Sequence, residues 1–324
     1  MTRNSSRRRR SSTLLPSSPA VAGFQHLESR TLLAGNVTAN ITNGNLLIQG
    51  DNLDNNFFVE PTANPNEVKI SGIGTTVNGS AFVTLPGLTG NIDFQLGDGN
   101  DTAQIFTSGM LDITLPGDVT ADLGEGNNIF SLFTLNSSKL TVAGNVVMNT
   151  GAGNDSFFAQ TNSASTVLTL NQNVTLNLGA GTNSTSIQTN AASAVTHLKG
   201  NLTINGGDNE DTLTISGNAS LAQTLVDGAL NFNVGDGSNS LTANTNSPDA
   251  TVIIGGKITY TGGDGNDSFK LNANTQDSQV MVNSDVSLNL GDGQNLAQAT
   301  SNAIDSKAEI FGSLTVNSGS GSDT

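Results

Sequence analysis

Apolar and polar residues alternate along most of this chain, in short segments that end at glycine-rich turns. In one such segment Val174 and Leu176 are apolar, while Thr175 and Asn177 are polar. Alternation with a period of two residues predicts strands that are buried on one face. The apolar spacing of an amphipathic helix is absent, and Gly, Asn and Thr are poor helix formers. The pattern therefore predicts an all-β protein.

The turns recur at a fixed interval. The motif G-x-G-x-[DN] or a close variant begins at Gly97, Gly124, Gly151, Gly179, Gly207, Gly235, Gly263, Gly291 and Gly319, at intervals of 27, 27 and then 28 residues. Apolar columns keep the same interval, as in Leu115, Val142, Leu170, Leu198, Val226, Ile254, Val282 and Ile310. One unit of this length cannot bury its own apolar face, so the units must stack. We therefore predict a parallel β-helix (β-solenoid) with about three short strands per 28-residue coil.

The last motif position alternates between two residue types. It reads Asp101, Asn128, Asp155, Asn183, Asp211, Asn239, Asp267, Asn295 and Asp323. The residue before the motif partly follows this alternation: Leu123, Leu178, Val234 and Leu290 precede Asn motifs, while Thr150, Gly206, Gly262 and Ser318 precede Asp motifs. Identical carboxylates stacked at about 4.8 Å repel one another. We interpret the intervening Asn residues as spacers that supply amide donors to the carboxylates.

Aspartates at the second and last motif positions are candidate metal ligands. Hard cations such as Ca²⁺ prefer carboxylate and carbonyl oxygens, and tight glycine turns expose carbonyls. The candidate residues are Asp98, Asp101, Asp208, Asp211, Asp236, Asp264, Asp267 and Asp292. Gly, Asn and Asp also form tight corners without any ligand. Calcium sites and metal-free corners are therefore two open interpretations of the same residues.

The motif resembles the calcium-binding RTX nonapeptide GGxGxDxUx. GGDGNDSFK (262–270) is very close to it, and LGDGNDTAQ (96–104) is also similar. The resemblance implies Ca²⁺ held by turn aspartates and turn carbonyls between stacked coils. Two departures stand against a full calcium ladder: the motif occurs once per coil rather than in tandem, and alternate copies carry Asn in place of Asp.

Composition and charge exclude several classes of protein. Only 35% of residues are hydrophobic and 12% are charged, which argues against a thick globular core. From residue 31 onward there are six Lys, no Arg and 26 acidic residues, a net charge of −20. This body lacks the basic surface that nucleic acid requires. There is no Cys, and no apolar run approaches the roughly 20 residues of a membrane span.

The two ends differ from the repeats. Residues 1–35 hold all six Arg and are predicted to form a basic, disordered export or sorting segment. HLESRTLLAGN (26–36) resembles the LEPR-XLL region of large bacterial surface-associated proteins, with Glu28, Arg30, Leu32 and Leu33 matching and Ser29 in place of Pro. The resemblance implies export. We predict a cap with the first irregular coils over 36–96, and a repeat array over 97–324 that is truncated at its C-terminal end.

These observations favour an exported, structural or adhesive solenoid of the bacterial cell surface, stiffened by Ca²⁺ at its turns, rather than an enzyme. The expected partners are cell-surface or matrix components, including glycans. Only two histidines occur: His26 lies in the N-terminal segment, and His197 lies on a predicted strand with no other His, Cys or Arg beside it. One alternative is a polysaccharide-active enzyme, since β-helices host such activities. Another is an ice- or glycan-binding protein that uses the outward row Thr120, Val147, Thr175, Thr203, Asn231, Thr259, Ser287 and Thr315, with the Asn-rich row beside it.

Overall fold

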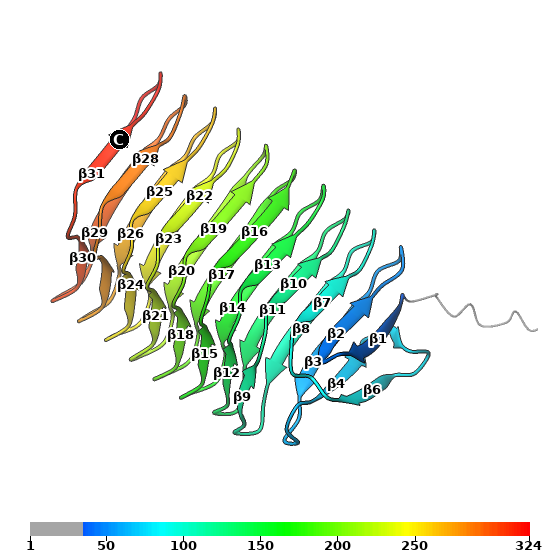
Figure 1. Ribbon diagram of the computed structural model, residues 1–324. Helices are drawn as coiled ribbons and strands as arrows, with labels where there is room; N and C mark the ends of the chain where they lie inside the picture. Colours follow the sequence, from blue (N-terminus) through cyan, green and yellow to red (C-terminus); the bar gives the residue numbers. More distant parts are fainter. Residues whose placement is uncertain (1–34) are drawn as a thin grey trace, which may run out of the picture. The chain divides into compact units, whose positions relative to one another are not determined.

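The computed structural model describes residues 35–324, and this part of the chain contains strands and turns but no helix. The strands build a β-solenoid of about eight turns with roughly 28 residues per coil (Figure 1). Each coil contributes three strands, and each strand pairs in parallel with its equivalent in the next coil. The predicted fold is therefore confirmed. Within residues 35–324, nothing has the length and hydropathy of a membrane-crossing helix.

The strands form three sheets that run along the solenoid. The first sheet has twelve strands, in the order β5 (Thr76–Val77), β1 (Asn36–Thr42), β2 (Asn45–Gln49), β7 (Ile92–Gln95), β10 (Val119–Asp122), β13 (Val146–Asn149), β16 (Val174–Gly179), β19 (Leu202–Gly206), β22 (Leu230–Asn233), β25 (Ile258–Thr261), β28 (Val286–Asn289) and β31 (Leu314–Asn317). The second has eleven, in the order β6 (Phe82–Pro86), β4 (Glu67–Gly72), β3 (Asn56–Pro61), β8 (Thr102–Thr107), β11 (Ile129–Thr134), β14 (Ser156–Thr161), β17 (Asn183–Thr189), β20 (Asp211–Gly217), β23 (Ser240–Thr245), β26 (Ser268–Ala273) and β29 (Leu296–Ser301). The third has eight, in the order β9 (Asp112–Leu115), β12 (Lys139–Val142), β15 (Val167–Leu170), β18 (Val195–Leu198), β21 (Gln223–Val226), β24 (Thr251–Ile254), β27 (Gln279–Val282) and β30 (Lys307–Ile310).

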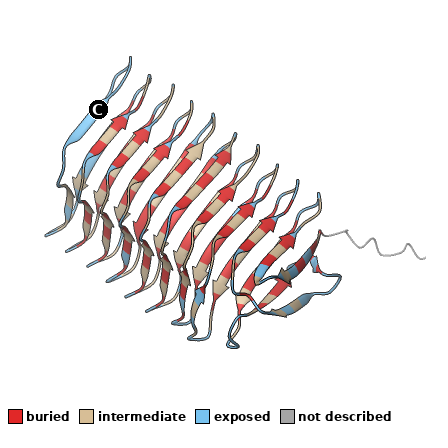
Figure 2. Cartoon of the chain, viewed as in Figure 1, coloured by how far each residue is buried: buried red, intermediate tan, exposed pale blue. Residues whose placement is uncertain are grey.

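The apolar columns predicted from the sequence form the core. Figure 2 shows buried residues repeating at the same place in successive strands of the stack. Pairing register follows the columns, because a slip of one residue would turn every apolar side chain outward. Val142 pairs with Leu170, for example, and both are fully buried. Burying such a side chain contributes about 1.5–3 kcal/mol. Leu314 and Val316, in the last strand of the first sheet, remain 51% and 43% exposed, because no further coil covers them.

Residues 36–96 close the N-terminal end of the stack with antiparallel pairs. Strands β2 and β3 occupy the places of a normal coil beneath β7 and β8. Where the third strand of that coil would follow, the chain instead folds into β4, β5 and β6, and β4 pairs antiparallel with both β3 and β6. This insertion separates the turn at 50–55 from the next turn by more than one repeat length. It also leaves β9 as the first strand of the third sheet.

Candidate functional site

The G-x-G-x-[DN] motifs form turns that join the first sheet to the second, and these turns lie directly over one another along the solenoid (Figure 1). Main chains of successive turns are hydrogen-bonded, as between Gly151 N and Gly124 O at 2.7 Å. Gly124 has a φ of 71°, and a Cβ at this position would overlap the carbonyl of Gly97 in the preceding turn. Glycine therefore meets two needs here, a left-handed backbone and a close approach between coils.

The last motif residues of all turns form one continuous ladder, which we call the Asx ladder. A main-chain N–H of one coil donates to the side-chain oxygen of the next, as from Asn128 to Asp155 at 2.8 Å and from Asp155 to Asn183 at 2.9 Å. Asn183 is an exception, because it donates through its side-chain Nδ2 to Asp211 at 2.9 Å. The other rungs run from Asn55 to Asp101 (2.7 Å), Asp101 to Asn128 (2.9 Å), Asp211 to Asn239 (2.8 Å), Asn239 to Asp267 (2.9 Å), Asp267 to Asn295 (2.9 Å) and Asn295 to Asp323 (3.0 Å).

The ladder extends further than the sequence motif indicated. Asn55, in the divergent turn at 50–55, is its first member and keeps the alternation with Asp101. Every member from Asn55 to Asn295 is at most 3% exposed. Asn55 could not be recognised as a member from the sequence, because the cap insertion lies between its turn (GDNLDN, 50–55) and the turn that begins at Gly97.

The Asn members also bind their own turns. Each carboxamide Nδ2 donates to the main-chain carbonyl four residues earlier, and all except that of Asn295 also donate to the carbonyl two residues earlier. In the turn that ends at Asn128, Nδ2 lies 3.1 Å from Gly126 O and 3.2 Å from Gly124 O. Corresponding bonds are made by Asn55, Asn183, Asn239 and Asn295. We expected these amides to donate mainly to the carboxylates. Most of them donate to the turn carbonyls instead, and the carboxylates accept hydrogen bonds from main-chain N–H groups.

The Asp members carry a buried oxygen without a donor. Oδ2 of Asp101, Asp155, Asp211 and Asp267 has no hydrogen-bond partner. Burial raises the pKa of Asp101 and of Asp211 to about 6, and it also raises the pKa of Asp155 and of Asp267. The N–H of the preceding coil partly offsets the effect of burial on the pKa, from Asn128 at Asp155 and from Asn239 at Asp267. An ionised carboxylate in this position costs stability, because its charge is desolvated.

The residue five places before the ladder member differs between most Asp coils and the Asn coils. Oδ2 of Asp211 faces Gly206 so closely that a Cβ at Gly206 would overlap it, and Asp267 bears the same relation to Gly262. A leucine or valine at either place would force the carboxylate to turn. In the Asn coils, Leu123, Leu178, Val234 and Leu290 occupy this position and are buried in the core. Leu96 is buried at the same position before Asp101, so a leucine there is compatible with Asp in one coil.

The eight predicted metal-ligating residues separate into two groups. Asp101, Asp211 and Asp267 are buried in the Asx ladder, whereas Asp98, Asp208, Asp236, Asp264 and Asp292 are exposed on the outside of the turns. Oδ1 of Asp236 accepts the N–H of Asp264 at 2.8 Å, so the exposed residues also bind main chain. No three acidic or histidine side chains converge in a metal-binding arrangement anywhere in residues 35–324. Calcium binding stays a prediction from the sequence.

The raised pKa values predict a pH dependence of stability. The folded carboxyls of Asp101 and Asp211 bind protons near pH 6, whereas the ordinary Asp value is 3.8. Their contribution to stability therefore grows as the pH falls from above 6 to about 4, and it is lost as the pH rises through 6. We expect D101N/D211N to melt several degrees higher than wild type at about pH 7.5, since each change removes a buried charge that costs on the order of 2 kcal/mol.

The matched control for this experiment is D98N/D208N, which makes the same chemical change at exposed positions of the same two turns. Melting curves are recorded for wild type and both variants between about pH 4 and pH 8. The control should keep the wild-type slope of melting temperature against pH, while D101N/D211N should flatten it. Equal slopes in all three proteins would contradict the assignment.

Two further ladders lie on the outside of the solenoid. The first lies on the outward face of the first sheet that carries the Thr-rich and Asn-rich rows, the Thr/Asn face. There Asn177 donates to Asn149 and Asn205 donates to Asn177, both at 2.8 Å. The second runs along the corner after the second sheet through Asn162, Asn190, Asn218, Asn246, Asn274 and Asn302, with bonds of 2.8–3.1 Å. The second ladder was not predicted from the sequence, although its Asn residues recur every 28 residues. Each inner carboxamide of a row donates one hydrogen bond and accepts one within that row, which favours a structural role for these amides.

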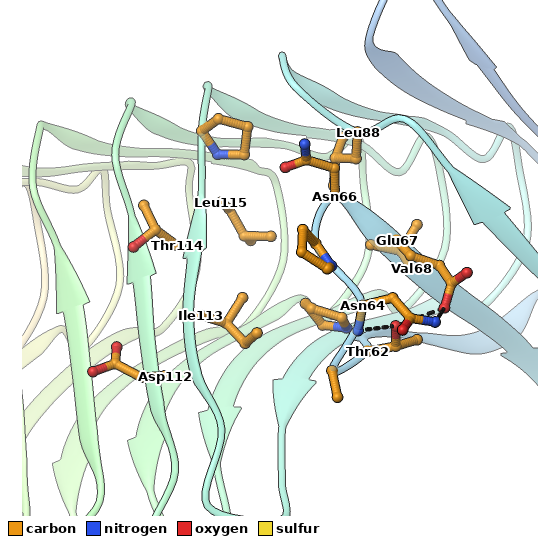
Figure 3. A pocket seen from close by; sticks show the side chains of 14 residues that line it. Thr62, Asn64, Asn66, Glu67, Val68, Leu88, Asp112, Ile113, Thr114 and Leu115 are labelled. Atoms are coloured by element: carbon orange, nitrogen blue, oxygen red, sulfur yellow. Dashed lines mark hydrogen bonds between the residues drawn. The ribbon is translucent and has the colours of Figure 1, made fainter.

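Within residues 35–324, two further places hold titratable groups with polar partners. His197 pairs with Asp227 at 2.8 Å on the outer surface of the third sheet. A groove of about 300 Å³ lies between the loop 61–67 and strand β9 (Figure 3). In this groove, hydrogen bonds from Thr62 and Asn64 lower the pKa of Glu67, so this carboxyl is not prepared to act as an acid near neutral pH.

Comparison with family models, with curated proteins and with solved structures gives no match for this chain.

Proposed function

We propose that this chain is an exported structural or adhesive element of the bacterial cell surface, and not an enzyme. The observation that carries the proposal is the uniformity of the solenoid. The Asx ladder and the two outer Asn ladders repeat from coil to coil, and the described part of the chain does not concentrate unusual residues at one place. A protein built this way offers length and a repeated surface rather than a single pocket.

The charge of the body supports the same role. Residues from 31 onward carry a net charge of −20, which keeps a rod with long polar faces soluble and disfavours nucleic acid as a partner. In this proposal the outer Thr and Asn rows are the surfaces that contact matrix components or glycans. The export part of the proposal rests on the resemblance of residues 26–36 to the LEPR-XLL region; residues 1–34 lie outside the described structure.

No specific observation favours either alternative, a polysaccharide-active enzyme or an ice- or glycan-binding protein. A polysaccharide-active site needs paired carboxylates or a cation with a basic residue, and the groove at β9 holds a bonded Glu67 and an Asp112 that pairs with Lys139 at 3.5 Å. Ice or glycan recognition by the Thr/Asn face stays a prediction, and the amides of this face are partly committed to one another.

Surface labelling tests the proposal. The full chain with a C-terminal epitope is expressed in a bacterial host that carries LEPR-XLL proteins, alongside a variant lacking residues 1–35. We expect antibody to label intact cells that express the full chain, and protease added outside to remove the label. The truncated variant should be labelled only after permeabilisation. Label on the full chain that appears only in permeabilised cells would overturn the export part of the proposal.

A further inference from the structure

The carbonyl groups that a cation would need are already bonded in alternate turns. A cation held between two successive turns takes oxygens from both, and Ca²⁺ requires six to eight of them. In the turn that ends at Asn239, the carboxamide Nδ2 donates to Gly235 O at 3.0 Å and Gly237 O at 3.3 Å. An amide N–H pointing at a carbonyl occupies the position in which a cation would stand, and it repels positive charge.

The alternation places this obstacle between every pair of coils. Asn55, Asn128, Asn183, Asn239 and Asn295 alternate with the Asp members along the whole ladder, so any two successive turns include one Asn turn. In the Asp turns, Oδ1 already accepts an N–H from the preceding coil. Only one buried Oδ2 per two coils then has no hydrogen-bond partner, whereas a calcium ion requires six to eight oxygen ligands.

The exposed aspartates do not complete the shell. Asp264 is exposed while Asp267, three residues later, is buried, so the two carboxylates of one motif lie on opposite sides of the turn. Asp236 and Asp292 instead accept main-chain N–H groups of the next coil, from Asp264 at 2.8 Å and from Ser320 at 2.7 Å. The donor set therefore does not fit a calcium ion, in disagreement with the resemblance to RTX repeats.

We propose that the Asn carboxamide takes the place of the cation, so that this solenoid is held together at its turns without calcium. The Asn side chain satisfies the turn carbonyls that a bound metal would otherwise satisfy, and its neutrality separates the buried carboxylates. The inference concerns the cohesion of the coils and is independent of where the protein acts in the cell.

Thermal melting of the full chain tests the proposal, followed by far-UV circular dichroism in EDTA, in Ca²⁺ and in Mg²⁺. We expect wild type to be folded in EDTA and to show no saturable, calcium-specific shift. The variant N183D/N239D converts 155, 183, 211, 239 and 267 into five successive Asp turns. It should melt at least about 5 °C lower than wild type in EDTA and regain part of this loss in Ca²⁺ but not in Mg²⁺.

The matched control is N190D/N246D, which adds the same two charges to the exposed corner ladder. It should lose little stability and show no calcium-specific recovery. A saturable rise in the melting temperature of wild type with Ca²⁺ would overturn the proposal. So would a N183D/N239D protein that melts like wild type in EDTA, because the Asn amides would then be dispensable. If the double variant does not fold in either condition, N183D alone is measured in the same way, with the same two deciding outcomes.

Discussion

Replacing Gly124 with alanine is expected to destabilise the solenoid by about 3 kcal/mol or more. Two costs combine at this position. The φ of 71° is unfavourable for any residue with a Cβ, and the added methyl group would overlap the Gly97 carbonyl in the turn below. That carbonyl lies between Leu96 and Gly99, whose N–H groups donate to Asp122 O at 2.9 Å and Glu125 O at 3.0 Å, so moving it would strain these bonds. The measurement is the midpoint of denaturant unfolding for the full chain.

Gly74 provides the matched control, because it has nearly the same φ, 72°, and no atom within 4 Å of an added Cβ. G74A should therefore show only the backbone cost, about 1–2 kcal/mol. The difference between the two variants isolates the close approach of the coils. Equal losses would mean that adjacent turns can separate at little cost, and the tight stacking of the motif would then be unimportant for stability.

Replacing Gly206 with valine is expected to cost about 3 kcal/mol or more on its own, and much less when Asp211 is changed to Asn as well. The valine Cβ would overlap Oδ2 of Asp211, so this buried carboxylate would have to turn from the position it holds. The double variant G206V/D211N reproduces the neighbouring turn, in which Val234 precedes Asn239 and Nδ2 binds the turn carbonyls.

A double-mutant cycle measures this coupling. Wild type, G206V, D211N and G206V/D211N are compared by unfolding midpoint, and we expect a favourable interaction of about 1–3 kcal/mol between the two changes. Additive losses would show that the residue before the motif and the ladder residue are chosen independently. The partial alternation of both positions in the sequence would then have no structural cause.

The regular part of the fold could be predicted because its physical causes recur in every coil. The column from Leu115 to Val282 is buried as expected, and each member pairs with the member one coil away. A single Val or Leu predicts little about the fold, but a column of apolar residues that recurs once per coil can be buried in only a few arrangements. The predicted three strands per coil follow from the same repetition.

The cap could not be predicted in the same way. Strands β4, β5 and β6 occur once, and their pairing, antiparallel for β4 with β3 and β6 and parallel for β5 with β1, follows no repeated pattern. The membership of Asn55 in the Asx ladder was hidden for the same reason, since its distance from Asp101 along the chain is set by an insertion.

The hydrogen bonding of the turns was only partly predictable from the sequence. The sequence identifies the turns and the alternation of Asp and Asn. It does not show that Asp264 and Asp267 face opposite sides of one turn, because that depends on backbone dihedrals imposed by the glycines between them. Nor does it show which hydrogen bond each carboxamide makes, since an Asn side chain can serve either a carboxylate or a carbonyl.

The alternation of the Asx ladder also constrains how the gene can change. Duplication or loss of two adjacent coils, about 56 residues, leaves Asp beside Asn at every junction. Duplication or loss of a single coil brings two Asp or two Asn members together at the point of recombination. Where two Asp members meet, two buried carboxylates face each other, whereas two Asn members bring no charges together. A change of two coils therefore always avoids the unfavourable pair, and a change of one coil avoids it only when it joins two Asn coils.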